Sequence, residues 1–282
     1  MSGTDKKFNP FYYKMKAENL PDLVIDNFRH YFDKLIQGDD GLIAEKDILP
    51  AESLPDIEDF QDGDLARIGK DMLEKAVVIK LNGGLGTSMG MDKPKGLLEV
   101  KNSLTFLDIT VRQNRKPGPG VPVVFMNSFY TRNDTLAALL PYSDFYDRSL
   151  PPDFLQHKIP KIDARGLTPA SLADNRILEW CPPGHGNVFP AIAQSGLLDR
   201  LLDNGYEFAF ISNIDNLGAV MDVSLLGYFV KQGFSFMIEA AERTPSDRKG
   251  GHLARLKSGA LILREAAQCP ENDTDSFQDI NR

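Results

Sequence analysis

The chain has 282 residues, of which 42% are hydrophobic and 26% are charged, and it carries a formal net charge of −8. This length can bury a full core, with room for one large domain and an appendage. The acidic balance argues against a nucleic-acid partner, because binding to a phosphate backbone requires a clustered basic surface. No apolar run approaches the roughly 20 residues that span a bilayer, and the polar start lacks the apolar centre of a signal peptide. We therefore expect a cytoplasmic protein with no membrane partner.

An amphipathic helix is predicted near the N-terminus. Apolar residues recur at intervals of three and four between positions 23 and 36, and the turn Gly38-Asp39-Asp40-Gly41 ends the pattern. We expect residues 1–72 to form a helical extension. Further along the chain are the only two cysteines, Cys181 and Cys269, which are too few for a structural zinc site and are expected to be ordinary thiols.

Beyond residue 75 the pattern changes to short apolar runs separated by lengths that suit crossover helices. Four strands are predicted, at residues 76–81, 121–126, 207–212 and 235–240. Strands and helices that alternate in this way indicate an α/β fold, with a mainly parallel sheet flanked by helices. In such a sheet, ligands collect at the carboxyl ends of the strands. We expect this core to occupy residues 73–282.

The most informative segment joins the first predicted strand to Lys95. The strand runs into four glycines and a Thr-Ser pair, and two lysines follow, Lys93 and Lys95. A glycine-rich turn behind a buried strand lets backbone N–H groups approach phosphate oxygens that a Cβ would hold away. The segment therefore predicts a nucleoside triphosphate site.

Three other interpretations of these glycines are weaker. A dinucleotide fingerprint requires Gly-x-Gly-x-x-Gly, but the spacing Gly84, Gly86, Gly90 is one residue too long. A Walker A loop requires Gly-Lys-Ser/Thr, and no glycine of this segment precedes a lysine. A purely structural glycine turn fits less well with the Lys-Pro-Lys sequence that follows.

Five ordered motifs resemble the UTP–glucose-1-phosphate uridylyltransferase family, also called UDP-glucose pyrophosphorylases. They are Leu81–Gly90 with Pro94-Lys95, Met126-Asn127-Ser128, Pro182–Gly186, Ser212–Gly218 and Lys249-Gly250-Gly251. The resemblance implies a nucleotidyltransferase core behind the helical extension. Family members continue beyond the position of Arg282 into an Asn-Thr-Asn-Asn segment, a second active-site lysine and a left-handed β-helix domain. None of these is in the sequence, so we expect a core that is incomplete at its C-terminus.

The resemblance also implies which residues meet UTP: Leu81, Asn82, Gly83, Gly84, Lys95, Gln156, Gly184 and Asp215. Lys95 would be the cation that reaches the phosphates. Gln156 would pair with uracil, because an amide offers a donor and an acceptor to the imide edge of the base. Its register is less constrained than that of the other motifs, and a solvated loop glutamine is the alternative interpretation.

Asp215 follows the apolar run 208–211, where the end of a strand would place its carboxylate at the ligand edge of the sheet. Such an oxygen ligand suits Mg²⁺, which takes one or two carboxylates together with phosphate oxygens. A turn residue is the competing interpretation. For the sugar phosphate, the resemblance implies contacts with His185, Asn213 and Ile214, whereas His30, His157 and His252 have no such support.

The leading hypothesis is thus a Mg²⁺-dependent enzyme, with Lys95 and Asp215 as catalytic residues, that forms UDP-glucose and pyrophosphate from UTP and glucose 1-phosphate. Two alternatives stay open. The chain could be a catalytically incomplete fragment that binds UTP or a UDP-sugar, or a pyrophosphorylase for another sugar 1-phosphate. Because the second lysine is absent, weak or no synthesis of UDP-glucose is expected.

Overall fold

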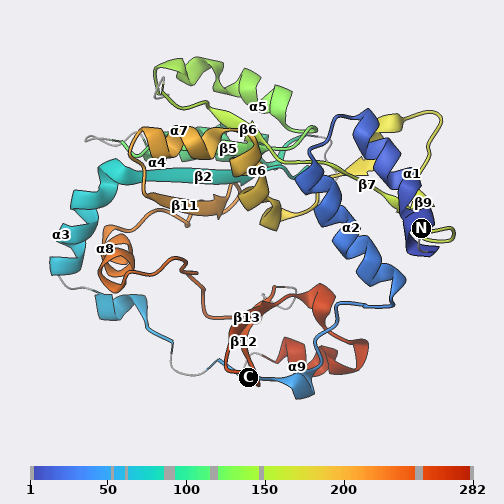
Figure 1. Cartoon of the computed structure of the whole chain (residues 1–282). Helices are drawn as coiled ribbons and strands as arrows, with labels where there is room; N and C mark the ends of the chain where they lie inside the picture. Colours follow the sequence, from blue (N-terminus) through green and yellow to red (C-terminus); the bar gives the residue numbers. More distant parts are fainter. Residues whose placement is uncertain are drawn as a thin grey trace.

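The computed structural model describes residues 3–51, 54–60, 63–85, 93–114, 120–145, 149–244 and 250–279. Its centre is a four-stranded parallel sheet in the order β11-β2-β5-β6 (Figure 1). The strands are β2 (Ala76–Asn82), β5 (Val123–Asn127), β6 (Asp153–Leu155) and β11 (Phe208–Asn213). This confirms three of the predicted strands, each to within one or two residues.

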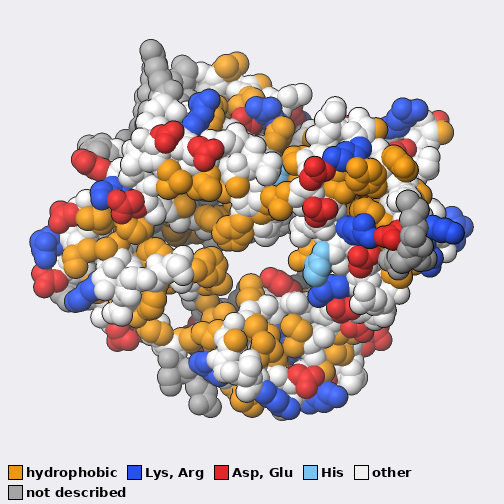
Figure 2. Space-filling model, in the orientation of Figure 1, with side chains coloured by type: hydrophobic (Ala, Val, Ile, Leu, Met, Phe, Trp, Pro, Cys, Tyr) orange, Lys and Arg blue, Asp and Glu red, His pale blue; other side chains and the backbone are white. Residues whose placement is uncertain are grey.

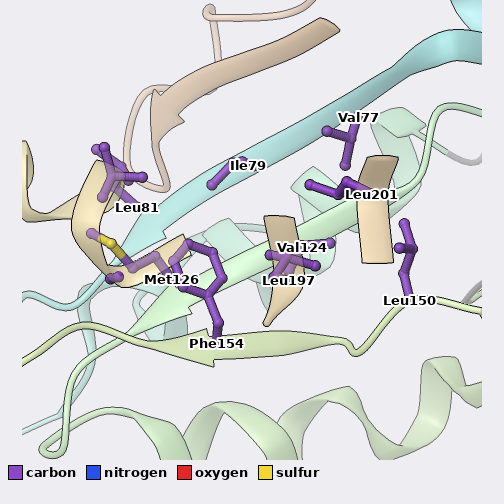
Figure 3. Close-up of a cluster of buried hydrophobic side chains, with 11 residues drawn as sticks. Val77, Ile79, Leu81, Val124, Met126, Leu150, Phe154, Leu197 and Leu201 are labelled. Atoms are coloured by element: carbon purple, nitrogen blue, oxygen red, sulfur yellow. The ribbon is translucent and has the colours of Figure 1, made fainter. Parts of the chain in front are cut away.

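Both faces of the sheet are covered by helices, as expected for a parallel sheet. On one face, α6 (Val188–Gln194) and α7 (Leu197–Asp203) pack their apolar side chains against Val77, Ile79 and Leu81 of β2 (Figure 3). On the other face, α4 (Phe106–Asn114) and α5 (Arg132–Leu139) pack on Val78. All seven residues of β2 are buried. The predicted α/β class, with helices flanking a parallel sheet, is therefore confirmed.

The N-terminal part forms a second apolar cluster. Helices α1 (Gly3–Ala17) and α2 (Asp22–Ile36) pack their phenylalanines against each other and against the buried Trp180. Short strands lie beside them: β7 (Ile159–Pro160) pairs with β10 (Trp180–Cys181), and β8 (Ile162–Asp163) pairs with β9 (Thr168–Pro169). The predicted helix at 23–36 is confirmed as α2.

Two glycines allow helices α3 (Gly63–Met72) and α8 (Val223–Gln232) to cross in close contact. A Cβ added to Gly69 would lie 1.8 Å from the carbonyl oxygen of Val223, and one added to Gly227 would lie 1.9 Å from that of Leu65. No side chain fits at either position, so the crossing requires glycine on both helices.

A small antiparallel sheet joins distant parts of the chain. Strand β1 (Ile48–Pro50) pairs with β12 (His252–Leu256), which pairs with β13 (Leu261–Arg264), and α9 (Thr274–Gln278) lies nearby. The side chain of Arg264 is fully buried there and contacts Glu45 at 2.7 Å. Figure 2 shows an opening between this small sheet and the part of the molecule that holds the four-stranded sheet. One further hairpin, β3 (Glu99–Lys101) with β4 (Leu104–Thr105), completes the strands of the described residues.

The prediction of a strand at residues 235–240 is wrong. This segment leaves α8 and runs toward β12 without pairing, and its side chains are exposed, with Phe236 at 64%. The alternation of residue types suits a strand, but strand formation depends on a neighbouring backbone, and none of the described residues pairs with this segment. Among the helices described, none combines the length and apolar character needed to cross a membrane.

Candidate active site

A pocket lies where β2 and β11 end, at the carboxyl edge of the parallel sheet. It has roughly 300 Å³ of empty space, including its solvent-open mouth. Seven of the described residues line it: Leu81, Gly84, Lys95, His185, Asn213, Ile214 and Asp215. All seven are among the residues predicted from the sequence, so the fold brings together side chains that lie up to 134 positions apart, from 81 to 215.

The charged pair of the pocket is Lys95 and Asp215. Lys95 Nζ lies 3.3 Å from Asp215 Oδ2, and each side chain is 30% exposed. The backbone holds both in place, because the Lys95 N–H donates to the carbonyl of Gly84 at 3.1 Å and the Ile214 N–H donates to that of Leu81 at 3.1 Å. The pair is thus fixed to the ends of β2 and β11, with both charges accessible to a ligand.

The side chain of Asn82 lies beneath the turn that carries Lys95. Its amide is buried and donates to Asn127 Oδ1 at 2.8 Å and to Thr135 Oγ1 at 2.9 Å. Gly96, next to Lys95, packs on the other side of this amide, since a Cβ at Gly96 would lie 2.5 Å from Asn82 Oδ1. The side chain of Asn82 therefore connects β2 to β5 and supports the turn that carries Lys95.

Gln156 is buried, at 5% exposure, and is not a solvated loop residue. Its backbone N–H donates to the carbonyl of Asn127 at 2.7 Å, and its Nε2 donates to the carbonyl of Gly184 at 2.7 Å. A Cβ at Gly83 would lie 2.5 Å from Gln156 Oε1. The φ angle of Gly184 is +104°, which favours glycine there. Gln156, Gly83 and Gly184 therefore form one contact network.

Two residues of this region were not assigned a role from the sequence. Ser128 Oγ donates to the carbonyl of Gly83 at 2.8 Å, which holds the start of the glycine turn. Lys80 is only 2% exposed and donates to Ser212 Oγ at 2.8 Å and to the carbonyl of Ala219 at 3.0 Å. Burial lowers the pKa of Lys80 to about 8. The only signal in the sequence was a lysine within an otherwise apolar strand.

Several predicted features lie outside the described residues, namely Gly86–Gly90 of the glycine turn and Lys249. Within the described ranges, no group of three or more His, Cys, Asp or Glu side chains could hold a metal ion. The expectation of a metal therefore depends on Asp215 together with phosphate oxygens of a ligand. Cys181 and Cys269 are both free thiols, as expected.

Known proteins resemble the chain over most of its length. The family model described as UTP–glucose-1-phosphate uridylyltransferase matches residues 25–282. The uridylyltransferase of Saccharomyces cerevisiae is 35% identical over 95% of this chain and 54% of its own length, and that of Solanum tuberosum is 40% identical over 76% of this chain and 45% of its own length.

Solved structures agree with these sequence matches. UDP-glucose phosphorylase from Trypanosoma brucei superimposes with a TM-score of 0.87 at 40% identity, covering 98% of this chain and 59% of that one. A variant of UDP-glucose pyrophosphorylase from Leishmania major, in complex with UDP-glucose, gives a TM-score of 0.87 at 37% identity over 100% of this chain and 61% of that one. The chain spans about half the length of the curated relatives it matches. Because the family model covers nearly the whole sequence, the chain belongs to the UTP–glucose-1-phosphate uridylyltransferase family.

Proposed function

We propose that the chain is a uridylyltransferase that forms UDP-glucose and pyrophosphate from UTP and glucose 1-phosphate. The observation that carries this proposal is the pocket at the ends of β2 and β11, whose described lining residues all lie in the sequence motifs that resemble the family. The complex of a Leishmania major relative with UDP-glucose supports the choice of substrate.

In the proposed reaction, an oxygen of the sugar phosphate attacks the α-phosphorus of UTP. The bond from that phosphorus to the bridging oxygen breaks, and pyrophosphate leaves. Negative charge moves toward the leaving group, so the site must hold positive charge close to the phosphates. Lys95 supplies an ammonium group that is accessible in the pocket. Charge-assisted hydrogen bonds of this kind are about twice as strong as neutral ones.

Asp215 would hold the Mg²⁺ ion, which supplies further positive charge to the phosphates when bound. Its carboxylate is accessible in the pocket and lies on the same side as Lys95, which suits a hard cation shared with phosphate oxygens. On the sugar-phosphate side, His185, Asn213 and Ile214 line the same pocket, so both reactants would meet between β11 and the turn at His185.

Recognition of uracil is proposed for Gln156. One hydrogen of its Nε2 is used by the carbonyl of Gly184. The second Nε2 hydrogen and Oε1 would serve the imide edge of the base, which presents both an acceptor and a donor. Gly83 and Gly84 provide backbone close to the nucleotide, because neither carries a side chain that would fill the pocket.

Calorimetry with UTP and Mg²⁺ tests the binding step on the purified chain. We expect Lys95→Ala to weaken binding by about tenfold to a hundredfold, since a hydrogen bond to a charged group contributes about 1.5–3 kcal/mol. Lys93→Ala is the matched control, because Lys93 is exposed and has no proposed role. A folded sample that gives no heat of binding would refute the nucleotide site.

A pyrophosphate-release assay with UTP, glucose 1-phosphate and Mg²⁺ tests the reaction itself. Release of pyrophosphate that depends on glucose 1-phosphate would support the full activity. If the chain binds UTP without releasing pyrophosphate, the alternative role as a UTP- or UDP-sugar-binding protein is the one to retain. Faster release with another sugar 1-phosphate would change the proposed substrate.

A further inference from the structure

Two residues beside the pocket, His157 and Asn187, form a pair of hydrogen bonds that we call the His157–Asn187 clasp. The backbone N–H of His157 donates to Asn187 Oδ1 at 2.9 Å, and Asn187 Nδ2 lies 3.0 Å from His157 Nδ1. Because Oδ1 accepts from a backbone N–H, the orientation of the amide is determined. Nδ2 must then donate to Nδ1, so the imidazole is neutral with its proton on Nε2.

The clasp joins the two segments that carry the proposed base and sugar-phosphate contacts. His157 directly follows Gln156, and Asn187 closes the short turn that contains His185. The carbonyl of Gly184 accepts from both Gln156 Nε2 at 2.7 Å and the backbone N–H of Asn187 at 3.1 Å. Asn187 is 8% exposed, so this network is largely shielded from water.

We propose that His157 and Asn187 are positioning residues of the nucleotide pocket, whose clasp holds Gln156 and the His185 turn in register only while the imidazole of His157 is neutral. Neither side chain lines the pocket, so both would act through their neighbours. The inference rests on the proposed function, because it assumes that the pocket takes a uridine nucleotide.

Protonation of His157 would open the clasp. A proton on Nδ1 would face the NH₂ group of Asn187, and rotating the amide would instead turn that NH₂ group toward the backbone N–H of His157. Either arrangement leaves two donors in contact, and an unmatched buried donor is costly. Burial lowers the pKa of His157 below its ordinary value of 6.5. The clasp should therefore be closed at neutral pH and open in mild acid.

The charged groups around His157 do not oppose this conclusion. Lys158, on the same segment, is paired with Glu18 at 2.6 Å and lies over the ring of Trp180. His185, a further titratable group, lies on the facing turn. Any effect of His185 on ligand affinity is common to the wild-type chain and to variants of the clasp, so it cancels when their pH profiles are compared.

The test measures binding of UDP-glucose by calorimetry between pH 5 and pH 8. UDP-glucose is the probe because its diphosphate has no terminal phosphate group that titrates in this range, unlike UTP. The wild-type chain should lose affinity in acid by about fivefold to tenfold, which corresponds to one hydrogen bond. His157→Asn places an amide oxygen where Nδ1 was, so it keeps the acceptor without the titration and should lack this loss.

For Asn187→Asp, we expect the affinity for UDP-glucose in acid to change in the opposite direction. A carboxylate accepts from the backbone N–H of His157 and also from a protonated Nδ1, so this variant should bind UDP-glucose better in acid than the wild-type chain does. Near-UV circular dichroism at each pH verifies that all three proteins stay folded. Identical pH profiles for the wild-type chain and His157→Asn would overturn this inference alone. Absence of binding at every pH would overturn the proposed function and this inference with it.

A ligand-free measurement tests the geometry of the clasp directly. The ¹⁵N spectrum of the imidazoles, with His157 assigned by its disappearance in His157→Asn, should show the Nε2–H tautomer at neutral pH. An Nδ1–H tautomer would overturn the clasp, whatever the ligand results.

Discussion

Replacing Gly83 with alanine should weaken binding of UTP through Gln156. The added Cβ would lie 2.5 Å from Gln156 Oε1, whereas ordinary contacts begin near 3.4 Å. Gln156 must therefore retreat by about 1 Å or rotate away. Its Nε2 is held by the carbonyl of Gly184 at 2.7 Å, and a retreat of that size would stretch this bond to about 3.6 Å, which is no longer a hydrogen bond.

The expected loss of affinity follows from these contacts. One broken hydrogen bond contributes about 0.5–1.5 kcal/mol, and a misplaced amide also loses a contact of similar size to uracil. We therefore expect the dissociation constant for UTP to rise about tenfold or somewhat more. Discrimination between UTP and CTP should fall with it, because CTP presents a different pattern of donors and acceptors on the same edge.

Calorimetry with UTP and CTP measures both effects, and a double-mutant cycle assigns the cause. If Gly83→Ala acts through Gln156, the same change should cost little in a Gln156→Ala background. Gly63→Ala is the control, because its added methyl meets nothing within 4 Å and lies outside the pocket. Wild-type affinity and base preference in Gly83→Ala would refute the reasoning. A full additional loss in the Gln156→Ala background would show instead that the methyl group meets the ligand.

Three further predictions concern stability. Gly96→Ala should lower the free energy of unfolding by about 1–3 kcal/mol, measured by urea denaturation, because its Cβ would lie 2.5 Å from the buried Asn82 Oδ1; an unchanged midpoint would contradict this. Burial lowers the pKa of Lys80 to about 8, so the unfolded chain binds more protons than the folded chain between pH 8 and about 10.5. The free energy of unfolding should therefore rise with pH in this range, by up to about 3 kcal/mol more than it does in Lys80→Met. Equal pH dependence of the two proteins would argue against the shift. Arg264→Met should destabilise the small sheet by about 3 kcal/mol, because it removes the fully buried partner of Glu45. Amide hydrogen exchange should become faster in β12 and β13 and stay unchanged elsewhere.

Strands β2 and β5 followed most directly from the sequence, because both are buried over their whole length. Strand β2 is buried on both faces, so its apolar run ends where the strand ends. Helix α1 falls within the predicted helical extension but was not located individually, although Phe8, Phe11 and Met15 are spaced as a helical stripe requires; Pro10 lies inside the helix. The short strands β6 to β10 were not predicted either, since two or three residues carry no period and their pairing depends on distant partners.

The site likewise contains contacts that could be predicted from the sequence and contacts that depend on distant segments. Parallel strands end at a common edge, so a lysine after one strand and a carboxylate after another could be expected to meet, as Lys95 and Asp215 do. The bond from Gln156 to Gly184 could not be predicted, because it joins two irregular segments whose path depends on tertiary packing. The clasp of His157 was missed for the same reason, since its partner lies 30 positions away in a turn.

The pairing of β1 with β12 has a consequence for the order of events during synthesis. Ile48 pairs with Leu256, so the ribosome must add more than 200 residues before this partner exists. At about 5–20 residues per second, Ile48 waits roughly 10–40 s, which is far longer than a hairpin needs to form. By then the strands β2, β5, β6 and β11 have all been made. The nascent chain should therefore assemble its parallel sheet first and close the small sheet last, with the backbone of residues 48–50 open to chaperones in the interval.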